Sequence, residues 1–119
     1  MRHSHRFHQT AGGVTPPIRE VSPADAKREQ VAGAVLVDVR ESDEVAQGYA
    51  TGAMHVSLSV FEQSIQKALP DLNTPVLLIC AAGVRSLAAA EYMQHLGYTN
   101  VASMAGGFRA WKNEGLPTS

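Results

Sequence analysis

The residues best suited to carry out chemistry are Cys80, the only cysteine of the chain, and Arg85, five positions later. Cys80 follows residues 76–79, an apolar run typical of a parallel strand that is covered on both faces. The segment after the loop has the apolar spacing of a helix, and we expect Ser86 to be its N-cap and Gly97 to end it. Unpaired N–H groups at a helix N-terminus favour negative charge, and Arg85 adds a cation beside them. A cysteine in this position is expected to be rich in thiolate, the nucleophilic form of the side chain.

The loop between these two residues is short and carries no charge of its own. It consists of Ala81, Ala82, Gly83 and Val84. Gly83 permits a positive φ angle, which lets several N–H groups converge on one point. We therefore predict that residues 81–86 form an anion-binding cup around the Cys80 sulfur. The alternative is a small buried hydrophobic cysteine without chemistry, but the composition and length of the loop favour the functional interpretation.

The loop sequence, residues 80–86, resembles the active-site loop of single-domain rhodaneses, sulfurtransferases that carry sulfur as a cysteine persulfide. Other stretches match the same family in the right order, and the resemblance spans about residues 18–117. These stretches are residues 36–41 with Glu44 and Gly48, residues 52–56, Gly106-Gly107 with Trp111, and residues 115–117. None of them is specific alone, but their order and spacing around the cysteine loop are.

Loop length helps to choose among relatives of this family. The related cell-cycle phosphatases, and the arsenate reductases that resemble them, place five residues between cysteine and arginine, whereas four intervene here. The narrower cup fits the outer sulfur of a persulfide better than a tetrahedral oxyanion. Because Ala81 and Ala82 supply no charge, Arg85 is the only cation of the loop, and a protein or small-molecule persulfide is as good a candidate donor as thiosulfate.

The order of the expected elements predicts an α/β fold. Strand-like segments at residues 18–21, 35–39, 54–56, 76–79 and 101–103 alternate with helical segments at residues 22–31, 43–47, 60–69, 86–96 and 108–114. Such alternation indicates a central parallel five-stranded sheet with helices on both faces. Gly106-Gly107 lacks the full glycine pattern and the lysine of a phosphate loop, so we expect close backbone packing there, next to or beneath the active-site edge.

Two further residues, Asp38 and Arg40, leave their strand at the edge where ligands bind in open parallel sheets. They could border the Cys80 loop, but we favour structural roles: a backbone hydrogen bond for Asp38 and an ion pair with Glu44 for Arg40. The resemblance likewise implies supports of the loop rather than reactants. His95 lies about 14 Å from the start of its helix by helical rise and is excluded as a base, and His55 is expected to make local hydrogen bonds.

Composition limits the remaining possibilities. The 119 residues are 45% hydrophobic, enough for one domain with a core, which we place at residues 18–117. With 10 basic and 11 acidic side chains, no nucleic-acid or membrane partner is predicted. Residues 1–17 are interpreted as a disordered arm or a cloning leader. Their histidines are not expected to form a metal site, because no cysteine or carboxylate lies nearby to complete it. We expect a cytoplasmic monomer.

The predicted function is a two-step sulfur transfer through a Cys80 persulfide, from thiosulfate or another persulfide donor to a thiol, or to cyanide in vitro. No metal or organic cofactor is expected. Two alternatives remain: a persulfide relay or binding module that serves a partner protein, and a phosphatase or arsenate reductase, which the loop length disfavours.

Overall fold

The structure, a computed structural model, describes residues 17–119 of the chain. The expected arm at residues 1–17 lies outside the described residues, apart from Pro17. The strands are β1 (Arg19–Val21), β2 (Val35–Asp38), β3 (Met54–His55), β4 (Val76–Ile79) and β5 (Val101–Met104). The helices are α2 (Pro23–Val31), α3 (Ser42–Val45), α4 (Phe61–Ala68), which follows a 3-10 turn η1 (Leu58–Val60), α5 (Arg85–His95) and α6 (Gly107–Asn113).

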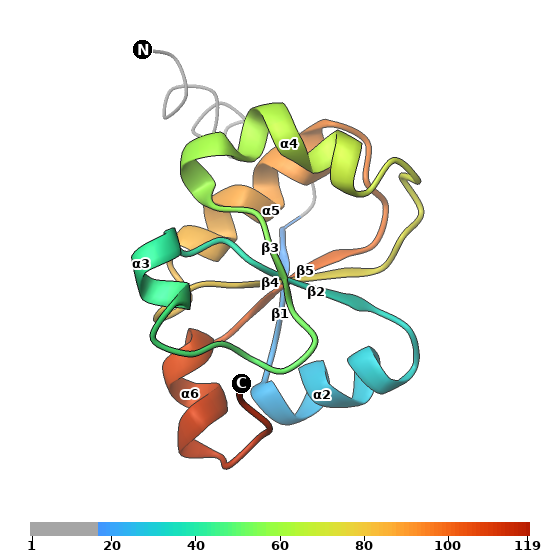
Figure 1. Ribbon diagram of the computed structural model, residues 1–119. Helices are drawn as coiled ribbons and strands as arrows, with labels where there is room; N and C mark the ends of the chain where they lie inside the picture. The colour runs from blue at the N-terminus through green and yellow to red at the C-terminus, as the bar shows by residue number, and fades with distance from the viewer. Residues whose placement is uncertain (1–16) are drawn as a thin grey trace.

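The strands form one parallel sheet in the order β1-β5-β4-β2-β3. β4 therefore lies at the centre of the sheet, between β5 and β2. Helices α4 and α5 cover one face and α2 and α6 the other, while α3 lies at one end of the sheet (Figure 1). The predicted α/β fold with a five-stranded parallel sheet and helices on both faces is confirmed.

The central strand shows why its sequence is apolar without a break. Val76 and Leu78 point into the core layer beneath α4 and α5, whereas Leu77 and Ile79 point into the layer beneath α2 and α6. Each of the four is at most 1% exposed. Successive side chains of a strand point to opposite faces, so a strand covered on both sides needs an apolar residue at every position.

The ends of the helices follow the sequence in two places and differ from it in one. The Ser22 side chain caps α2 by accepting a hydrogen bond from the Asp25 N–H at 3.1 Å, and Gly97 ends α5 with a φ of +106°. The prediction that Ser86 caps α5 is wrong. The helix begins one residue earlier, at Arg85, after Val84, which already has helical angles. Ser86 therefore lies inside the first turn, where its side chain is buried.

The register of the sheet gathers the polar residues of the fold at one edge. Asp38 is opposite Ile79, the residue before Cys80, and Ser103 is opposite Leu78. The loop after β4, the start of α6 after β5 and the residues after β2 therefore meet at the carboxyl edge of the sheet. Open parallel sheets bind their ligands at this edge.

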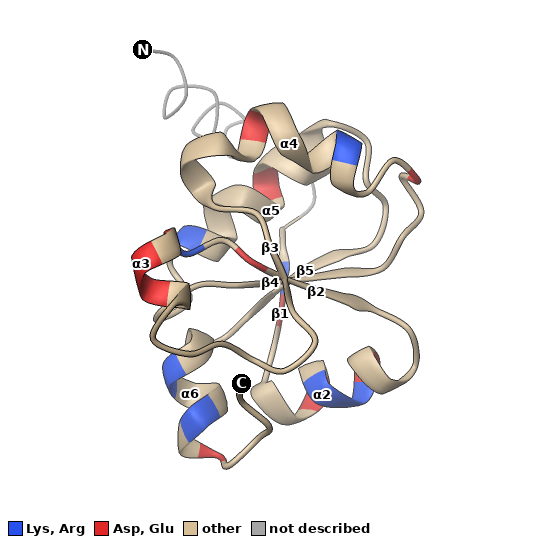
Figure 2. Ribbon diagram, in the orientation of Figure 1, with Lys and Arg blue, Asp and Glu red and all other residues tan. Residues whose placement is uncertain are grey.

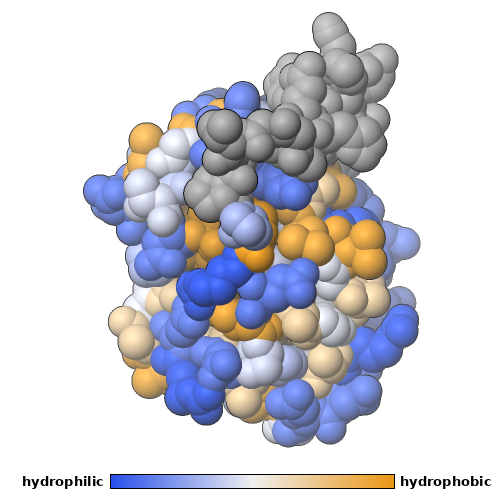
Figure 3. Space-filling model, turned by 180° about the vertical axis from the view of Figure 1, so that it is seen from behind, coloured by the Kyte–Doolittle hydropathy of each residue, from blue (hydrophilic) through white to orange (hydrophobic). Residues whose placement is uncertain are grey.

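The C-terminal segment and the surface complete the fold. Trp111 is fully buried and donates its indole N–H to the Pro117 carbonyl at 2.7 Å, and the main chains of Tyr49 and Ser119 exchange two hydrogen bonds. On the face in Figure 3, hydrophobic side chains lie in groups separated by hydrophilic ones. Within residues 17–119, no helix has both the length and the apolar character needed to span a bilayer.

Candidate active site

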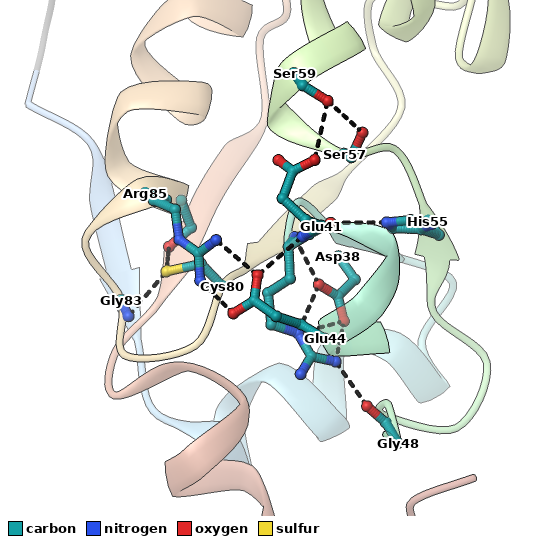
Figure 4. Close-up of polar contacts among 12 residues, drawn as sticks. Asp38, Glu41, Glu44, Gly48, His55, Ser57, Ser59, Cys80, Gly83 and Arg85 are labelled. Carbon is teal, nitrogen blue, oxygen red and sulfur yellow. Dashed lines mark hydrogen bonds and ion pairs between the residues drawn. The ribbon is translucent and has the colours of Figure 1, made fainter. Parts of the chain in front are cut away.

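The cysteine lies where the sequence predicted it, directly after the central strand. Cys80 is a free thiol that is 1% exposed. The Gly83 N–H donates to its Sγ atom at 3.0 Å, and the Ser86 hydroxyl lies 3.5 Å from the same atom (Figure 4). Gly83 has a φ of +98°, a conformation that side-chain-bearing residues rarely adopt. The loop therefore folds back over its own cysteine, and Gly83 and Ser86 contact the sulfur.

A second serine lies behind the first. The hydroxyls of Ser86 and Ser103 are 2.7 Å apart, and neither residue is more than 1% exposed. Ser103 can donate to Ser86 while Ser86 donates to the sulfur when Cys80 is a thiolate. The sequence analysis did not single out Ser103. The one available signal was a hydroxyl inside an otherwise apolar buried strand, where a polar group needs a partner.

The surroundings of the sulfur lower the pKa of the Cys80 thiol. Burial of the thiol opposes this by raising its pKa, but several hydrogen bonds to the sulfur outweigh burial. They come from the Ser86 hydroxyl and from the main-chain N–H groups of Ser86, Gly83 and Ala82. Donors that favour the charged form lower the pKa of an acid. The thiolate is the nucleophilic form of cysteine, so the loop prepares Cys80 for attack.

The arginine of the loop is bound by an acidic residue from another part of the chain. Both oxygens of the Glu44 carboxylate, on α3, accept hydrogen bonds of 2.9 Å from the Arg85 guanidinium. This pair, together with the Glu41 N–H that donates to the same carboxylate at 3.0 Å, holds the pKa of Glu44 at about 2. The prediction of an ion pair between Arg40 and Glu44 is wrong, because the Glu44 carboxylate binds Arg85 instead.

Arg40 pairs with Asp38. The Arg40 guanidinium donates to both Asp38 oxygens at 2.7 to 3.1 Å and to the Gly48 carbonyl at 2.8 Å, and Asp38 also accepts the main-chain N–H of Arg40. Both residues are at most 5% exposed. The ring of His55 donates from Nε2 to the Arg40 carbonyl at 2.7 Å, so its expected local hydrogen bond is confirmed.

The glycine pair at the start of α6, Gly106 before the helix and Gly107 as its first residue, lets the helix pack against the loop. The Phe108 N–H donates to the Cys80 carbonyl at 2.7 Å, and the Arg109 N–H donates to the Ala81 carbonyl at 3.2 Å. A Cβ atom on Gly107 would lie 2.5 Å from the Ala81 carbonyl, so no larger residue fits without a shift of the backbone. This confirms the predicted close backbone packing. The peptide whose Ala81 carbonyl faces α6 also carries the Ala82 N–H, one of the main-chain groups that lower the pKa of the Cys80 thiol.

Of the two histidines considered, neither contributes a base to the sulfur. His95 is the last residue of α5, whereas Arg85 and Ser86 are at its start. His55 is occupied by the Arg40 carbonyl. Within residues 17–119, no group of three or more metal-ligating side chains is positioned to hold a metal ion. Among the described residues, the site consists of a nucleophilic sulfur and donors that stabilise negative charge on it.

Comparison with known proteins finds one matching family and several similar proteins. Residues 22–114 match the family described as Rhodanese-like domain. The thiosulfate sulfurtransferase GlpE of Haemophilus influenzae is 36% identical over 101 residues, which cover 85% of this chain and 94% of that protein. GlpE of Pseudomonas fluorescens is 42% identical over 95 residues, covering 80% and 85%. A rhodanese-related protein from Thermoplasma volcanium superposes with a TM-score of 0.74 at 31% identity, covering 85% of this chain and 97% of that one.

Proposed function

This chain belongs to the rhodanese-like domain family, and from that membership we propose that it is a sulfurtransferase that works through a persulfide on Cys80. The observation that carries the proposal is the environment of the sulfur. A buried thiol accepts a hydrogen bond from the Gly83 N–H and contacts the Ser86 hydroxyl, and its pKa is lowered. An inert structural cysteine buried in apolar surroundings would have a raised pKa instead.

In the first step, the Cys80 thiolate attacks the sulfane sulfur of a donor. A new bond forms between Sγ and that sulfur, and the bond to the rest of the donor breaks. With thiosulfate as the donor, the electron pair of the broken bond leaves with sulfite. The N–H groups of the loop stabilise the negative charge of the persulfide that remains.

In the second step, a nucleophilic acceptor attacks the outer sulfur. A thiolate acceptor becomes a persulfide, or cyanide becomes thiocyanate, and the electron pair of the sulfur–sulfur bond returns to Cys80 as a thiolate. The two steps balance with cysteine as the only carrier, so they require no cofactor. Four residues between Cys80 and Arg85 support a cup of the size of one sulfur atom rather than of a tetrahedral oxyanion.

The identity of the donor is also part of the proposal. The two GlpE relatives are thiosulfate sulfurtransferases, which supports thiosulfate as a donor. The pairing of Arg85 with Glu44 supports a donor with less negative charge, because the cation of the loop is already neutralised. We therefore propose that the enzyme accepts thiosulfate but uses a small-molecule or protein persulfide at least as well.

The test is the mass of the intact protein after brief treatment with thiosulfate, followed by cyanide and a thiocyanate assay. We expect a gain of one sulfur atom that cyanide removes and that the Cys80→Ser variant does not show. A persulfide donor serves as the second substrate. If neither donor adds sulfur to the folded parent protein, or if the Cys80→Ser variant turns over normally, the proposed function is wrong.

A further inference from the structure

A concave site lies between α3 and α4, and none of the residues that line it belongs to the loop after β4. Its volume is about 580 Å³, within the usual range of pockets that bind small molecules. Its walls come from the start of α3, from the end of β3 and the residues after it, from the turn η1 and from α4. We call this site the α3–α4 pocket, and it is separate from the cysteine and its loop.

The polar groups of the α3–α4 pocket can all accept hydrogen bonds. The Glu41 carboxylate accepts one from the Ser59 hydroxyl at 2.9 Å (Figure 4), and a carboxylate has about four acceptor positions. His55 donates from Nε2 to the Arg40 carbonyl, so the neutral ring has a lone pair on Nδ1, which no hydrogen bond within residues 17–119 engages. Serine hydroxyls complete the polar lining: Ser42, Ser57, Ser59 and Ser64.

The charge of the α3–α4 pocket is negative. Of its lining residues in the described part of the chain, Glu41 alone carries a full charge, and it forms no ion pair there. Residues 41–44 hold three carboxylates, whereas the cation that pairs with them, Arg85, is bound by both oxygens of Glu44. Figure 2 shows the acidic bands of α3 beside the basic band at the start of α5. A concave surface with an excess of one charge attracts a ligand of the opposite charge.

Aliphatic side chains form the rest of the wall. Val60, Ser64 and Ala68 follow one another every four residues from η1 into α4, the spacing of one helix face. Val60 is 44% exposed, so its apolar surface is open to a ligand, and Val56 lies in the same wall. A hydrocarbon chain that covers this surface is removed from water together with it. The pocket therefore combines hydrogen-bond acceptors, a negative charge and an apolar wall.

Two other classes of ligand fit this lining poorly. An anion would meet the Glu41 carboxylate and, among the described lining residues, no arginine or lysine. A protein-bound metal ion is usually held by three or more side chains of histidine, cysteine, aspartate or glutamate, and residues 17–119 contain no such group. A cation that donates hydrogen bonds matches the lining better than either.

We propose that the α3–α4 pocket binds a primary ammonium group carried on an aliphatic chain. An ammonium group has three N–H donors and no acceptor, which Glu41, His55 and the serine hydroxyls can satisfy. The aliphatic chain packs against Val60 and the wall beside it. Two sources share this chemistry: a free alkylamine and the lysine side chain of another protein. The inference does not depend on the proposed sulfur transfer, because neither Cys80 nor its loop lines the pocket.

The test is a titration of the ¹⁵N-labelled parent protein at fixed pH and low ionic strength, followed by its amide signals. The free amine is represented by n-butylammonium chloride, with n-butanol as its neutral counterpart and sodium butyrate as its anionic one. The lysine side chain is represented by N-acetyl-glycyl-lysyl-glycinamide, with the same peptide acetylated on the lysine as its neutral counterpart. No turnover is needed, so the result is independent of the sulfur transfer.

We expect an amine probe to shift the signals of Ser42, His55 and Ser59 in a saturable way. Each neutral counterpart, and butyrate, should bind about tenfold more weakly or worse, because it lacks the charge-assisted hydrogen bonds. Added salt should weaken binding of the amine, since part of the pocket is open to solvent. The amine that binds more tightly identifies the source. If neither amine shifts these signals, or if both bind no better than their neutral counterparts, the proposal is overturned.

Two variants and a matched control locate the binding. Glu41→Gln removes the charge and keeps an oxygen that can accept from Ser59, so it should weaken amine binding about five- to tenfold. Val60→Ser removes exposed apolar surface and should weaken it about threefold. Asp43→Asn removes the same charge from an exposed position of α3 that does not line the pocket, and a change of less than about twofold is expected. Equal losses in Glu41→Gln and Asp43→Asn would mean that the overall charge of α3 attracts the amine, and would overturn the pocket.

Discussion

The buried serine pair makes a quantitative prediction about the reactivity of Cys80. In Ser86→Ala, the thiolate loses a hydroxyl donor that lies 3.5 Å from Sγ, while the N–H of Gly83 at 3.0 Å remains. A hydrogen bond to a charged group contributes about 1.5–3 kcal/mol, and the long distance places this one at the lower end. About 1.5 kcal/mol corresponds to about a tenfold lower ratio of thiolate to thiol at a fixed pH below the pKa. Since removal of the donor raises the pKa, the alkylation profile moves to higher pH.

The assay is the rate of alkylation by iodoacetamide as a function of pH. At pH values below the midpoint, we expect Ser86→Ala to react about tenfold more slowly than the parent, with the same limiting rate at high pH. Ser103→Ala should lie between the two, because Ser103 acts on the sulfur only through Ser86. Ser64→Ala, on α4, is the control. An unchanged midpoint in Ser86→Ala would refute the assignment of a thiolate-stabilising role to this hydroxyl.

Stability separates this role from simple packing. In Ser86→Ala, the buried Ser103 hydroxyl loses the only hydrogen-bond partner that the structure shows for it, which costs about 1–3 kcal/mol of unfolding free energy. Replacing both serines by alanine leaves no unsatisfied hydroxyl, so the double variant should be more stable than Ser86→Ala. Its alkylation profile should nevertheless stay at high pH. If the double variant recovers stability but not reactivity, the Ser86 hydroxyl acts on the sulfur itself. If it recovers both, that direct role of the Ser86 hydroxyl is contradicted.

Three other changes have definite expected outcomes. Gly107→Ala brings a Cβ atom to 2.5 Å from a main-chain carbonyl of the loop after β4. This variant should lose about 3 kcal/mol of unfolding free energy in urea, and alkylation of its thiol should be slower. Gly115 also has a positive φ but open space around it, so Gly115→Ala should lose only about 1 kcal/mol. The Glu44 pKa of about 2 lies below its usual 4.5, so the pair with Arg85 stabilises the fold above about pH 4.5 and its contribution disappears as the pH falls toward 2. Acid should therefore destabilise the parent by up to about 1 kcal/mol more than Glu44→Gln, and equal pH dependence of the two would exclude this contribution. Tyr98→Phe removes a buried hydroxyl that donates to a main-chain carbonyl, and a loss of about 1–2 kcal/mol in the same unfolding assay is expected, with no change in alkylation.

Much of the fold follows from local patterns in the sequence. The apolar run before Cys80 predicts a central strand, because only a strand covered on both faces needs an apolar residue at every position. Ser22 and Gly97 mark the ends of helices, because capping depends on one side chain or one φ angle. The start of α5 was predicted one residue late, because Ser86 is a good cap by type while its hydroxyl is needed in the core instead.

The candidate site could be predicted only in part, because some of its contacts join residues that are far apart in the sequence. The loop around Cys80 is contiguous in sequence, and its glycine and its length are visible there. The sequence analysis assigned Glu44 to Arg40 and missed its pairing with Arg85. Glu44 is 41 positions from Arg85, and nothing in its local sequence points to so distant a partner. Arg40 and Glu44 are four positions apart, a spacing that favours an ion pair within a helix. Arg40, however, lies outside α3 and is bound by Asp38.

The sequence by itself determined the position of the cysteine at the end of a buried strand, the short loop after it, and the alternation of strands and helices of a parallel sheet. The tertiary structure decided which distant groups meet the sulfur and the loop. Ser103 reaches Ser86 because β5 lies beside β4, and α6 reaches the loop carbonyls because it starts at the same edge. Strand order and register are set by packing of the whole core rather than by neighbouring residues, so contacts across 17 or 41 positions are fixed only when the sheet has formed.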